Sequence, residues 1–338
     1  MYFWYILRNY LKNFVITLIG FALLFVLVDY SFNFAKLPNS SNLQTLYIFY
    51  VFIDSIFILY PLALVFAFLL TLNKMIKFNE LVSFYSLGFK PFKILKPIIY
   101  FSLFFFILIM YLQSTKIAYV NQYAKAIKNN MQLKNKNLFL KYNNSVVYIK
   151  ELNPILKEAY DVKIFVVKDN KLIKIIYTKK AKFFKNHWIS NKAVITTLSK
   201  DRWDKEEKKL VFLENFKPKI LSNLKTLNTI SLSDAYIAIK YFKDIDLNRV
   251  LSIVFFKVFT PLSLIILIIL FFYTSPIHIR ISNVSIFMIK SISLTIFVWG
   301  VELLLFKFTK QGVMPYYVIA LPFFILIILT FLILRRYK

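Results

Sequence analysis

The chain of 338 residues has little or none of several residue types that common functions require. It has no cysteine, which excludes structural disulfides and thiolate metal sites, so any folded domain must depend on its own core. Its glycines are Gly20, Gly88, Gly300 and Gly312, and their spacing fits neither G-x-x-x-x-G-K-[ST] nor G-x-G-x-x-G. Nucleotide binding through either glycine-rich loop is therefore excluded.

Histidine is almost as scarce, with His187 and His278 alone. The topology predicted below places them on opposite sides of a membrane, so we expect no two-histidine metal site and no Ser-His-Asp arrangement. The sequence thus predicts a chain that is not an enzyme and binds no cofactor itself. Any energy source would be a partner protein or an ion gradient.

Apolar sequence, by contrast, is abundant. Hydrophobic residues make up 59% of the chain and aromatic residues 19%, which is beyond the range of soluble globular domains. Crossing a bilayer takes ~20 apolar residues per helix, and six runs are long enough. They are 13–35, 47–72, 92–114, 253–273, 284–306 and 314–334. We expect a polytopic α-helical membrane protein, with three transmembrane helices in 1–115 and three in 251–338, the first being a retained helix and not a cleaved signal.

Basic residues are unevenly distributed over the short loops, which predicts an orientation. The N-terminus, the loops after the second and fourth runs and the C-terminus carry eleven of them, whereas the alternate loops carry three. The eleven are Arg8, Lys12, Lys74, Lys77, Lys90, Lys93, Lys96, Arg280, Arg335, Arg336 and Lys338; the three are Lys36, Lys307 and Lys310. Both termini are therefore expected in the cytoplasm, and the central region outside.

The polar region between the third and fourth runs alternates apolar and polar residues in short stretches. They are 137–142, 145–151, 161–168, 172–178, 193–198 and 209–214. Asn- and Asp-containing turn signals separate them, which is typical of antiparallel strands. We expect an all-β domain over 116–230, a sandwich or jelly roll.

Net charge is +28, but lysine outnumbers arginine 38 to 6. This bias is typical of an AT-rich coding sequence. The coding bias therefore explains the net charge at least as well as an anionic partner does.

From Ser231 the apolar spacing becomes helical, which predicts an amphipathic linker helix at the membrane surface within 231–250, capped by Ser231 or Ser233.

The segment 77–90, between the second and third runs, predicts a short helix that projects into the cytoplasm. Glu80 begins it, and Gly88 and Pro91 mark its end. Its apolar residues are Leu81, Val82, Phe84, Tyr85 and Leu87. A short capped helix with an apolar face suits a groove in another protein. An ordinary interfacial turn would give the same pattern.

These features together resemble the LptF/LptG permease family of the lipopolysaccharide-export ABC transporter. The likeness covers the whole chain, from three helices, a β-jellyroll insert and three further helices to several local motifs. The motifs are Glu80-Leu81-Val82 followed by Ser86-Leu87-Gly88-Phe89, Val146-Val147-Tyr148-Ile149 with nearby Asn143 and Asn144, Lys257 to Ser263, and Gly312 to Pro315. They favour the LptG branch of the family over the LptF branch.

The resemblance implies a subunit of an LptB2FG transporter in the bacterial inner membrane, with a periplasmic jellyroll. Two permease subunits would form a cavity that lipopolysaccharide, or lipooligosaccharide, enters from the outer leaflet. An LptB ATPase dimer, which binds the ATP and Mg, would grip the coupling helix formed by Glu80, Leu81, Val82, Phe84, Tyr85, Leu87 and Gly88. The lipid would then pass through the jellyroll to LptC and the LptA bridge, with its acyl chains shielded.

Ionisable residues inside the apolar runs need an explanation, because each costs ~2.5 to 3.5 kcal/mol at mid-bilayer. Asp29 and Asp54 either pair with nearby polar groups or line a wet cavity. Lys257 and Lys290 lie near helix ends, where snorkelling to the interface accounts for both. The resemblance adds a functional reading for Lys257 and a role in a lateral gate for Glu302.

Lys36 stands at the outer end of the first run, where the head group of an outer-leaflet lipid would lie. An ammonium binds phosphate as a point charge, so Lys36 is the first candidate for a lipid phosphate. Relatives carry their basic residue about one turn earlier, where this chain has Asn33. A lysine that snorkels at the interface is the alternative.

Two other classes of protein stay open on the residues alone. One is a membrane scaffold for the β domain that transports nothing. The other is a gradient-driven carrier in which Asp29, Asp54 and Glu302 carry protons, although no inverted repeat with broken helices is visible. An ATPase and a second permease as partners would distinguish the transporter from both.

Overall fold

The computed structural model describes residues 2–128, 135–142, 145–153, 157–168, 171–184, 187–198, 203–212, 230–241, 246–278 and 283–336. The chain divides into a helical unit, Met1–Lys128 with Asn248–Lys338, and a sheet unit, Asn129–Leu247. The predicted organisation, in which helices from both ends of the chain enclose a β domain in sequence, is confirmed.

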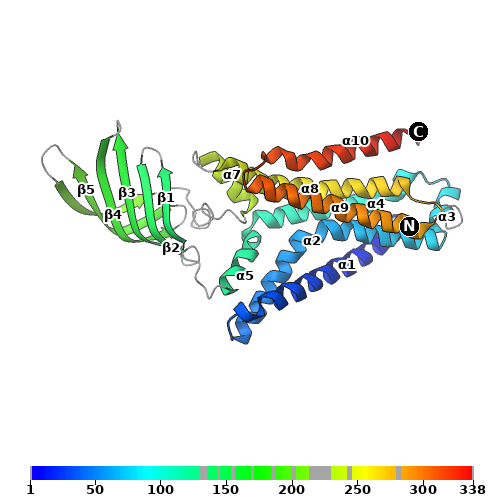
Figure 1. The fold of residues 1–338 in the computed structure, drawn as a ribbon, viewed down its shortest axis with the longest axis horizontal. Coiled ribbons are helices and arrows are strands. Elements are labelled where there is room, and N and C mark those ends of the chain that lie inside the picture. Colours follow the sequence, from blue (N-terminus) through cyan, green and yellow to red (C-terminus); the bar gives the residue numbers. More distant parts are fainter. Residues whose placement is uncertain are drawn as a thin grey trace. The chain divides into compact units, whose positions relative to one another are not determined.

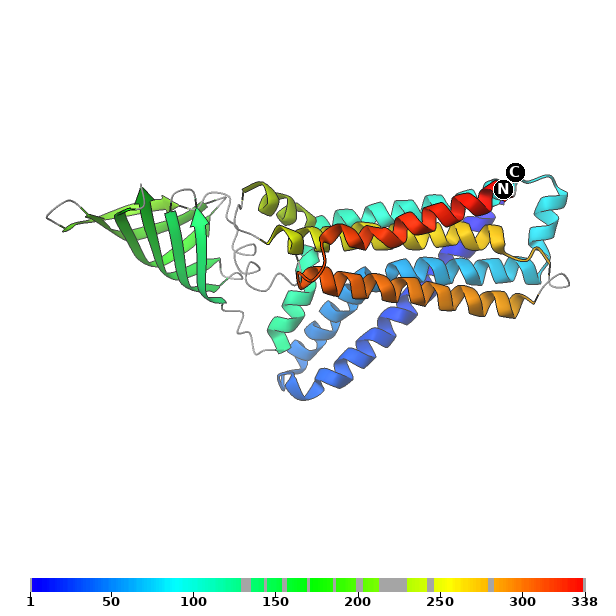
Figure 2. The same cartoon turned by 45° about the horizontal axis from the view of Figure 1, so that its top comes forward.

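The helical unit contains the six predicted spans, all within the described part of the chain. They are α1 (Tyr2–Asn33), α2 (Ser41–Lys77), α4 (Pro91–Ser114), α8 (Leu247–Thr274), α9 (Val284–Lys310) and α10 (Leu321–Arg336), which follows the 3-10 turn η3 (Tyr316–Ala320) (Figure 1). Figures 1 and 2 show both chain termini at one end of this unit, here called the terminal end, with η3 at the other.

The start of the first helix was predicted too late. The apolar run begins at residue 13, but α1 begins at Tyr2. Its buried residues recur every fourth position, at Ile6, Tyr10, Phe14, Leu18, Ala22 and Val26. Arg8 and Lys12 lie off this stripe, so they interrupt the hydropathy of the run without interrupting the packed face of the helix.

The start of the central domain also differs from the prediction. Residues 116–128 form the 3-10 turn η2 (Lys116–Tyr119) and the helix α5 (Val120–Lys128), both within the helical unit. Ala124 and Ile127 of α5 are buried against Val26, Tyr47 and Val51. The spacing of these apolar residues is helical, and packing on α1 and α2 fixes the segment as part of the membrane bundle.

The sheet unit is one antiparallel sheet whose strands lie in chain order. The strands are β1 (Asn135–Tyr142), β2 (Ser145–Asn153), β3 (Glu158–Lys168), β4 (Lys171–Phe184), β5 (His187–Leu198) and β6 (Trp203–Phe212). Each contains one of the predicted alternating stretches, although residues 213 and 214 of the last stretch lie outside the described residues. The order follows the chain, because each strand pairs antiparallel with the next one. A second sheet or a jelly-roll crossover is not seen among the described strands, so the jelly roll stays a prediction.

Alternation gives the sheet two unlike faces. Val147, Ile149, Val162 and Ile164 are buried on one face. Between them, Tyr148 and Lys163 point to the other face, because successive side chains of a strand alternate.

A short helix, α7 (Leu232–Tyr241), follows the sheet. Ser231 Oγ accepts a hydrogen bond from the backbone N–H of Asp234 at 3.1 Å, which confirms Ser231 as the N-cap. Its predicted position at the membrane surface stays a prediction.

Asn248 ties three parts of the helical unit together. Its Nδ2 donates to the carbonyls of Thr309 at 3.1 Å and Met314 at 3.0 Å, and its Oδ1 accepts from the N–H of Tyr316 at 2.7 Å. One side chain at the start of α8 therefore fixes the link between α9 and α10.

We predict that Asn248→Ala lowers the free energy of unfolding by about 2 to 3 kcal/mol, since each hydrogen bond contributes roughly 0.5 to 1.5 kcal/mol. Thermal unfolding of the purified protein in mild detergent measures the loss. Asn9→Ala is the matched control, because Asn9 accepts an exposed hydrogen bond from Lys74. Equal melting temperatures for the two variants would contradict the role of Asn248.

Glu158 gives the sheet a dependence on pH. Its carboxylate accepts a hydrogen bond from the Tyr160 hydroxyl and forms ion pairs with Lys180 at 2.9 Å and Lys182 at 3.4 Å. These contacts, the Tyr160 bond first, lower the pKa of Glu158 to about 2. The unfolded value is higher, about 4.3. The stabilisation is therefore fully present above that unfolded pKa and is lost as the pH falls towards 2.

Glu158→Gln is accordingly expected to lower stability at pH 6 and to reduce the further loss on acidification to pH 3. Melting temperatures at the two pH values, followed by intrinsic fluorescence, test this. Glu207→Gln, a change at an exposed carboxylate on β6, should leave the pH dependence as in the wild type.

Candidate functional site

The predicted coupling segment forms α3 (Glu80–Ser86), a short helix between α2 and α4 at the terminal end (Figures 1 and 2). It ends in a Schellman motif. The N–H of Gly88 bonds the carbonyl of Tyr85 at 2.9 Å, and the N–H of Phe89 bonds that of Phe84 at 3.0 Å. Gly88 has φ of 77°, and the rings of Phe84 and Phe89 are 5.6 Å apart, which is the hydrophobic contact typical of the motif.

Three contacts hold α3 on the membrane helices. Leu81 is fully buried in the main core of the unit. Glu80 Oε1 accepts a hydrogen bond from the hydroxyl of Tyr5 on α1 at 2.7 Å. The ring of Phe89 packs edge-on against Tyr2, with centroids 4.8 Å apart. A force applied to α3 would therefore be transmitted to α1.

The sequence predicts that the apolar residues of this segment form one face for a partner. In the structure they point in different directions. Leu81 points inward, whereas Leu87 is 73% exposed and Phe78, just before the helix, is 64% exposed. Val82 and Tyr85 are half-buried and line a pocket of about 450 Å³ together with Phe272 at the end of α8. Burial raises the pKa of the Tyr85 hydroxyl to about 12, so it is neutral at physiological pH.

The predicted acidic residues of the first two spans are paired with polar side chains. Asp29 Oδ2 accepts from the Tyr47 hydroxyl at 2.5 Å, which joins α1 to α2. Asp54 Oδ2 accepts from Asn121 Nδ2 at 2.5 Å, which joins α2 to α5. No sequence signal indicates Tyr47 or Asn121, because neither residue lies in a motif of distinctive spacing.

Lys257 on α8 is half-buried and close enough to Asp54 for a favourable charge interaction. The structure thus brings Lys257 and Asp54 together, which sequence reasoning did not. Lys290 is exposed on α9.

Lys36 and Glu302 have contrasting surroundings. Lys36 lies in the turn η1 (Phe34–Lys36), exposed, with no ion pair or hydrogen bond among the described residues. Glu302 on α9 is fully buried, and its carboxyl lies near Thr260 and Ser263 of α8 with no hydrogen bond of normal geometry in the described part of the chain. Lys36 is available to a ligand, whereas Glu302 faces the α8–α9 contact.

The described residues contain no group of three His, Cys, Asp or Glu that could hold a metal ion. Six membrane-spanning helices, a capped helix held between two of them and an inserted sheet define a class, the polytopic membrane proteins with an extramembrane β domain.

A comparison with protein families makes the class specific. The family model described as lipopolysaccharide export system permease LptF/LptG matches residues 4–336. The chain therefore belongs to the LptF/LptG family of lipopolysaccharide export permeases. No curated protein is significantly similar to it in sequence. Membership confirms the resemblance seen in the motifs, and it makes the chain a membrane subunit of a transporter in a family that is not catalytic.

We predict that Gly88→Ala destabilises the end of α3 by about 1 kcal/mol, because a side chain is disfavoured at positive φ. An added Cβ at Gly88 meets nothing within 4 Å, so the cost comes from the backbone alone. Hydrogen exchange of the amides of Gly88 and Phe89 measures it. Gly20→Ala, in open space within α1, should be neutral or stabilising. Unchanged exchange in the Gly88 variant would contradict the capping role.

Proposed function

We propose that this chain is the LptG-type permease subunit of an LptB2FG transporter that extracts lipopolysaccharide, or lipooligosaccharide, from the outer leaflet of the inner membrane. ATP hydrolysis by an LptB dimer drives the extraction. A sister subunit of the LptF type completes the cavity, and the lipid leaves through the sheet unit to LptC and the LptA bridge. The LptF role in the same complex is the alternative.

The observation that carries this proposal is the attachment of α3 to the membrane helices. Its Schellman cap fixes its length, Leu81 anchors it, and Leu87 and Phe78 offer apolar surface. Exposed apolar side chains on a rigid helix suit a groove on a partner protein. The bond from Tyr5 to Glu80 links the same helix to α1. Movement of an ATPase would in this way reach the first transmembrane helix.

The polar contacts favour this function over a proton carrier. Asp29 and Asp54 each accept a short hydrogen bond from a neighbouring helix, as expected of residues that hold helices together. Lys36, exposed in its turn, is the residue that we assign to a lipid phosphate. Glu302 would act at the gate by packing α9 against α8.

The orientation follows from the loop charges. The terminal end, with α3, faces the cytoplasm and its ATPase, and the sheet unit lies in the periplasm. The transported lipid would then meet the buried face of the sheet with its acyl chains, away from water.

The test is Leu87→Arg. Because Leu87 is exposed, the change leaves the fold intact, but it places a charge where the ATPase would bind apolar surface. We expect at least tenfold less LptB recovered with the tagged permease after co-expression, and a matching loss of ATPase activity. The control is Leu172→Arg, at an exposed leucine of β4. Full recovery of LptB with the Leu87 variant would refute the coupling role, and absence of any ATPase with the wild type would favour a scaffold.

A further inference from the structure

The face of the sheet opposite the buried one carries an ordered row of side chains. Tyr148 of β2 pairs directly with Lys163 of β3, which pairs with Tyr177 of β4. Phe139 of β1 continues the row, its ring 4.7 Å from that of Tyr148. Side chains directly opposite on neighbouring strands are about 5 Å apart. The row is therefore a strip of aromatic surface with an ammonium group in its middle.

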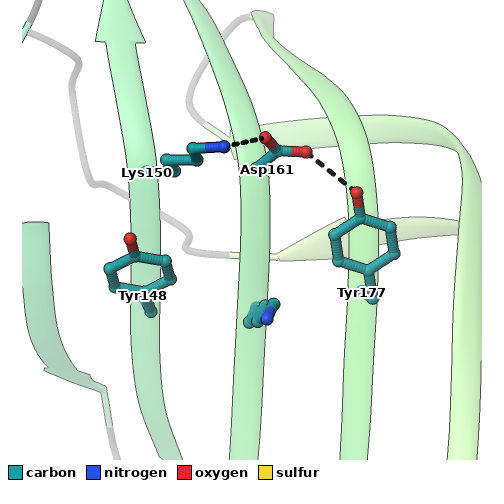
Figure 3. A pocket seen from close by; sticks show the side chains of 5 residues that line it. Tyr148, Lys150, Asp161 and Tyr177 are labelled. Atoms are coloured by element: carbon teal, nitrogen blue, oxygen red, sulfur yellow. Dashed lines mark hydrogen bonds and ion pairs between the residues drawn. The ribbon is translucent and has the colours of Figure 1, made fainter. Parts of the chain in front are cut away.

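An aspartate stands beside this row. Asp161 Oδ1 accepts a hydrogen bond from the Tyr177 hydroxyl at 2.8 Å, and Oδ2 pairs with Lys150 Nζ at 3.4 Å (Figure 3). These contacts, the Tyr177 bond first, lower the pKa of Asp161, so the carboxylate stays charged. Its φ of 51° is unfavourable for a residue with a side chain, and such strain is concentrated at functional sites.

The row borders a hollow of about 600 Å³ lined by Tyr148, Lys150, Asp161, Lys163 and Tyr177. This is the size of a small-molecule site. Lys163 is exposed and has no ion pair or hydrogen bond among the described residues. An uncommitted cation, two tyrosine rings and an oriented carboxylate thus converge on one open hollow.

We propose that this hollow binds a phosphorylated sugar. Tyrosine rings offer flat apolar surface to the ring of a saccharide. The carboxylate of Asp161 accepts hydrogen bonds from sugar hydroxyls, while Lys163 pairs with the phosphate. Inorganic phosphate would contact the lysines alone, because it has no ring that could pack on the aromatic row.

The proposed function supplies the source of such a ligand, and this part of the inference rests on it. A lipopolysaccharide has a phosphorylated saccharide joined to acyl chains. The two faces of the sheet match the two parts, since Val147, Ile149 and Val162 are buried on the opposite face. The sheet would bind the saccharide outside and shield the acyl chains inside.

The experiment uses the full chain in mild detergent and glucosamine 6-phosphate as the probe, with binding measured by calorimetry. Lys163→Ala is expected to weaken binding about tenfold, and Tyr177→Phe about threefold because Asp161 loses the bond that orients it. Lys209→Ala removes the same charge from β6 outside the row and should change binding less than twofold. Tyr177→Phe keeps the ring and the fold, so a loss of binding there does not reflect misfolding.

Three results would overturn the proposal. They are no binding of the probe to the wild type, equal losses in the Lys163 and Lys209 variants, or inorganic phosphate binding as tightly as the sugar phosphate. The last result would reduce the site to a general anion site.

A second arm separates this inference from the proposed function. A photo-crosslinking residue is placed at Tyr148 or at Ile149, on opposite faces, in the assembled transporter with lipopolysaccharide and ATP. Crosslinking at both positions supports both proposals. Crosslinking at Ile149 alone overturns the saccharide site and leaves the transport role. Probe binding that depends on Lys163, with no crosslink at either position, supports the site and counts against transport through this sheet.

Discussion

A bilayer offers no water to polar groups, and the helical unit is built around this constraint. Helices satisfy the backbone internally, and several buried polar side chains find partners on other helices. Tyr10 meets the carbonyl of Leu64 and the hydroxyl of Ser102. Asp29 and Asp54 meet Tyr47 and Asn121. These polar residues of the spans are thus placed where helices meet.

Backbone hydrogen bonding also explains why α3 is a separate, firmly capped helix. The chain turns between α2 and α4, and the Schellman motif at Gly88 satisfies the last carbonyls of α3. Leu81 and the Tyr5 bond then fix its position. A helix held in this way is joined to the bundle more firmly than a loop without such contacts would be.

The sheet unit meets a different constraint, since it buries apolar side chains on one face and keeps polar side chains on the other. Strand alternation provides both, with Val147 and Ile149 on one face and Tyr148 and Lys150 on the other. The pairing register decides what the polar face can do, because it sets Lys163 between two tyrosines. A shift of one residue in β3 would exchange Lys163 for a buried valine or isoleucine.

The sequence by itself determined the six spans, the strands and the capped helix, because hydropathy, alternation and glycine at a helix end are local properties. It placed the start of α1 too late and assigned α5 to the β domain, since the burial of Tyr10 and Ile127 depends on helices distant in sequence. Only the tertiary structure decided that Leu81 points inward, that Asp54 lies beside Asn121 and Lys257, and that Tyr148, Lys163 and Tyr177 form one row. Those facts depend on which segments pack together, and no local pattern specifies a partner that lies far away along the chain.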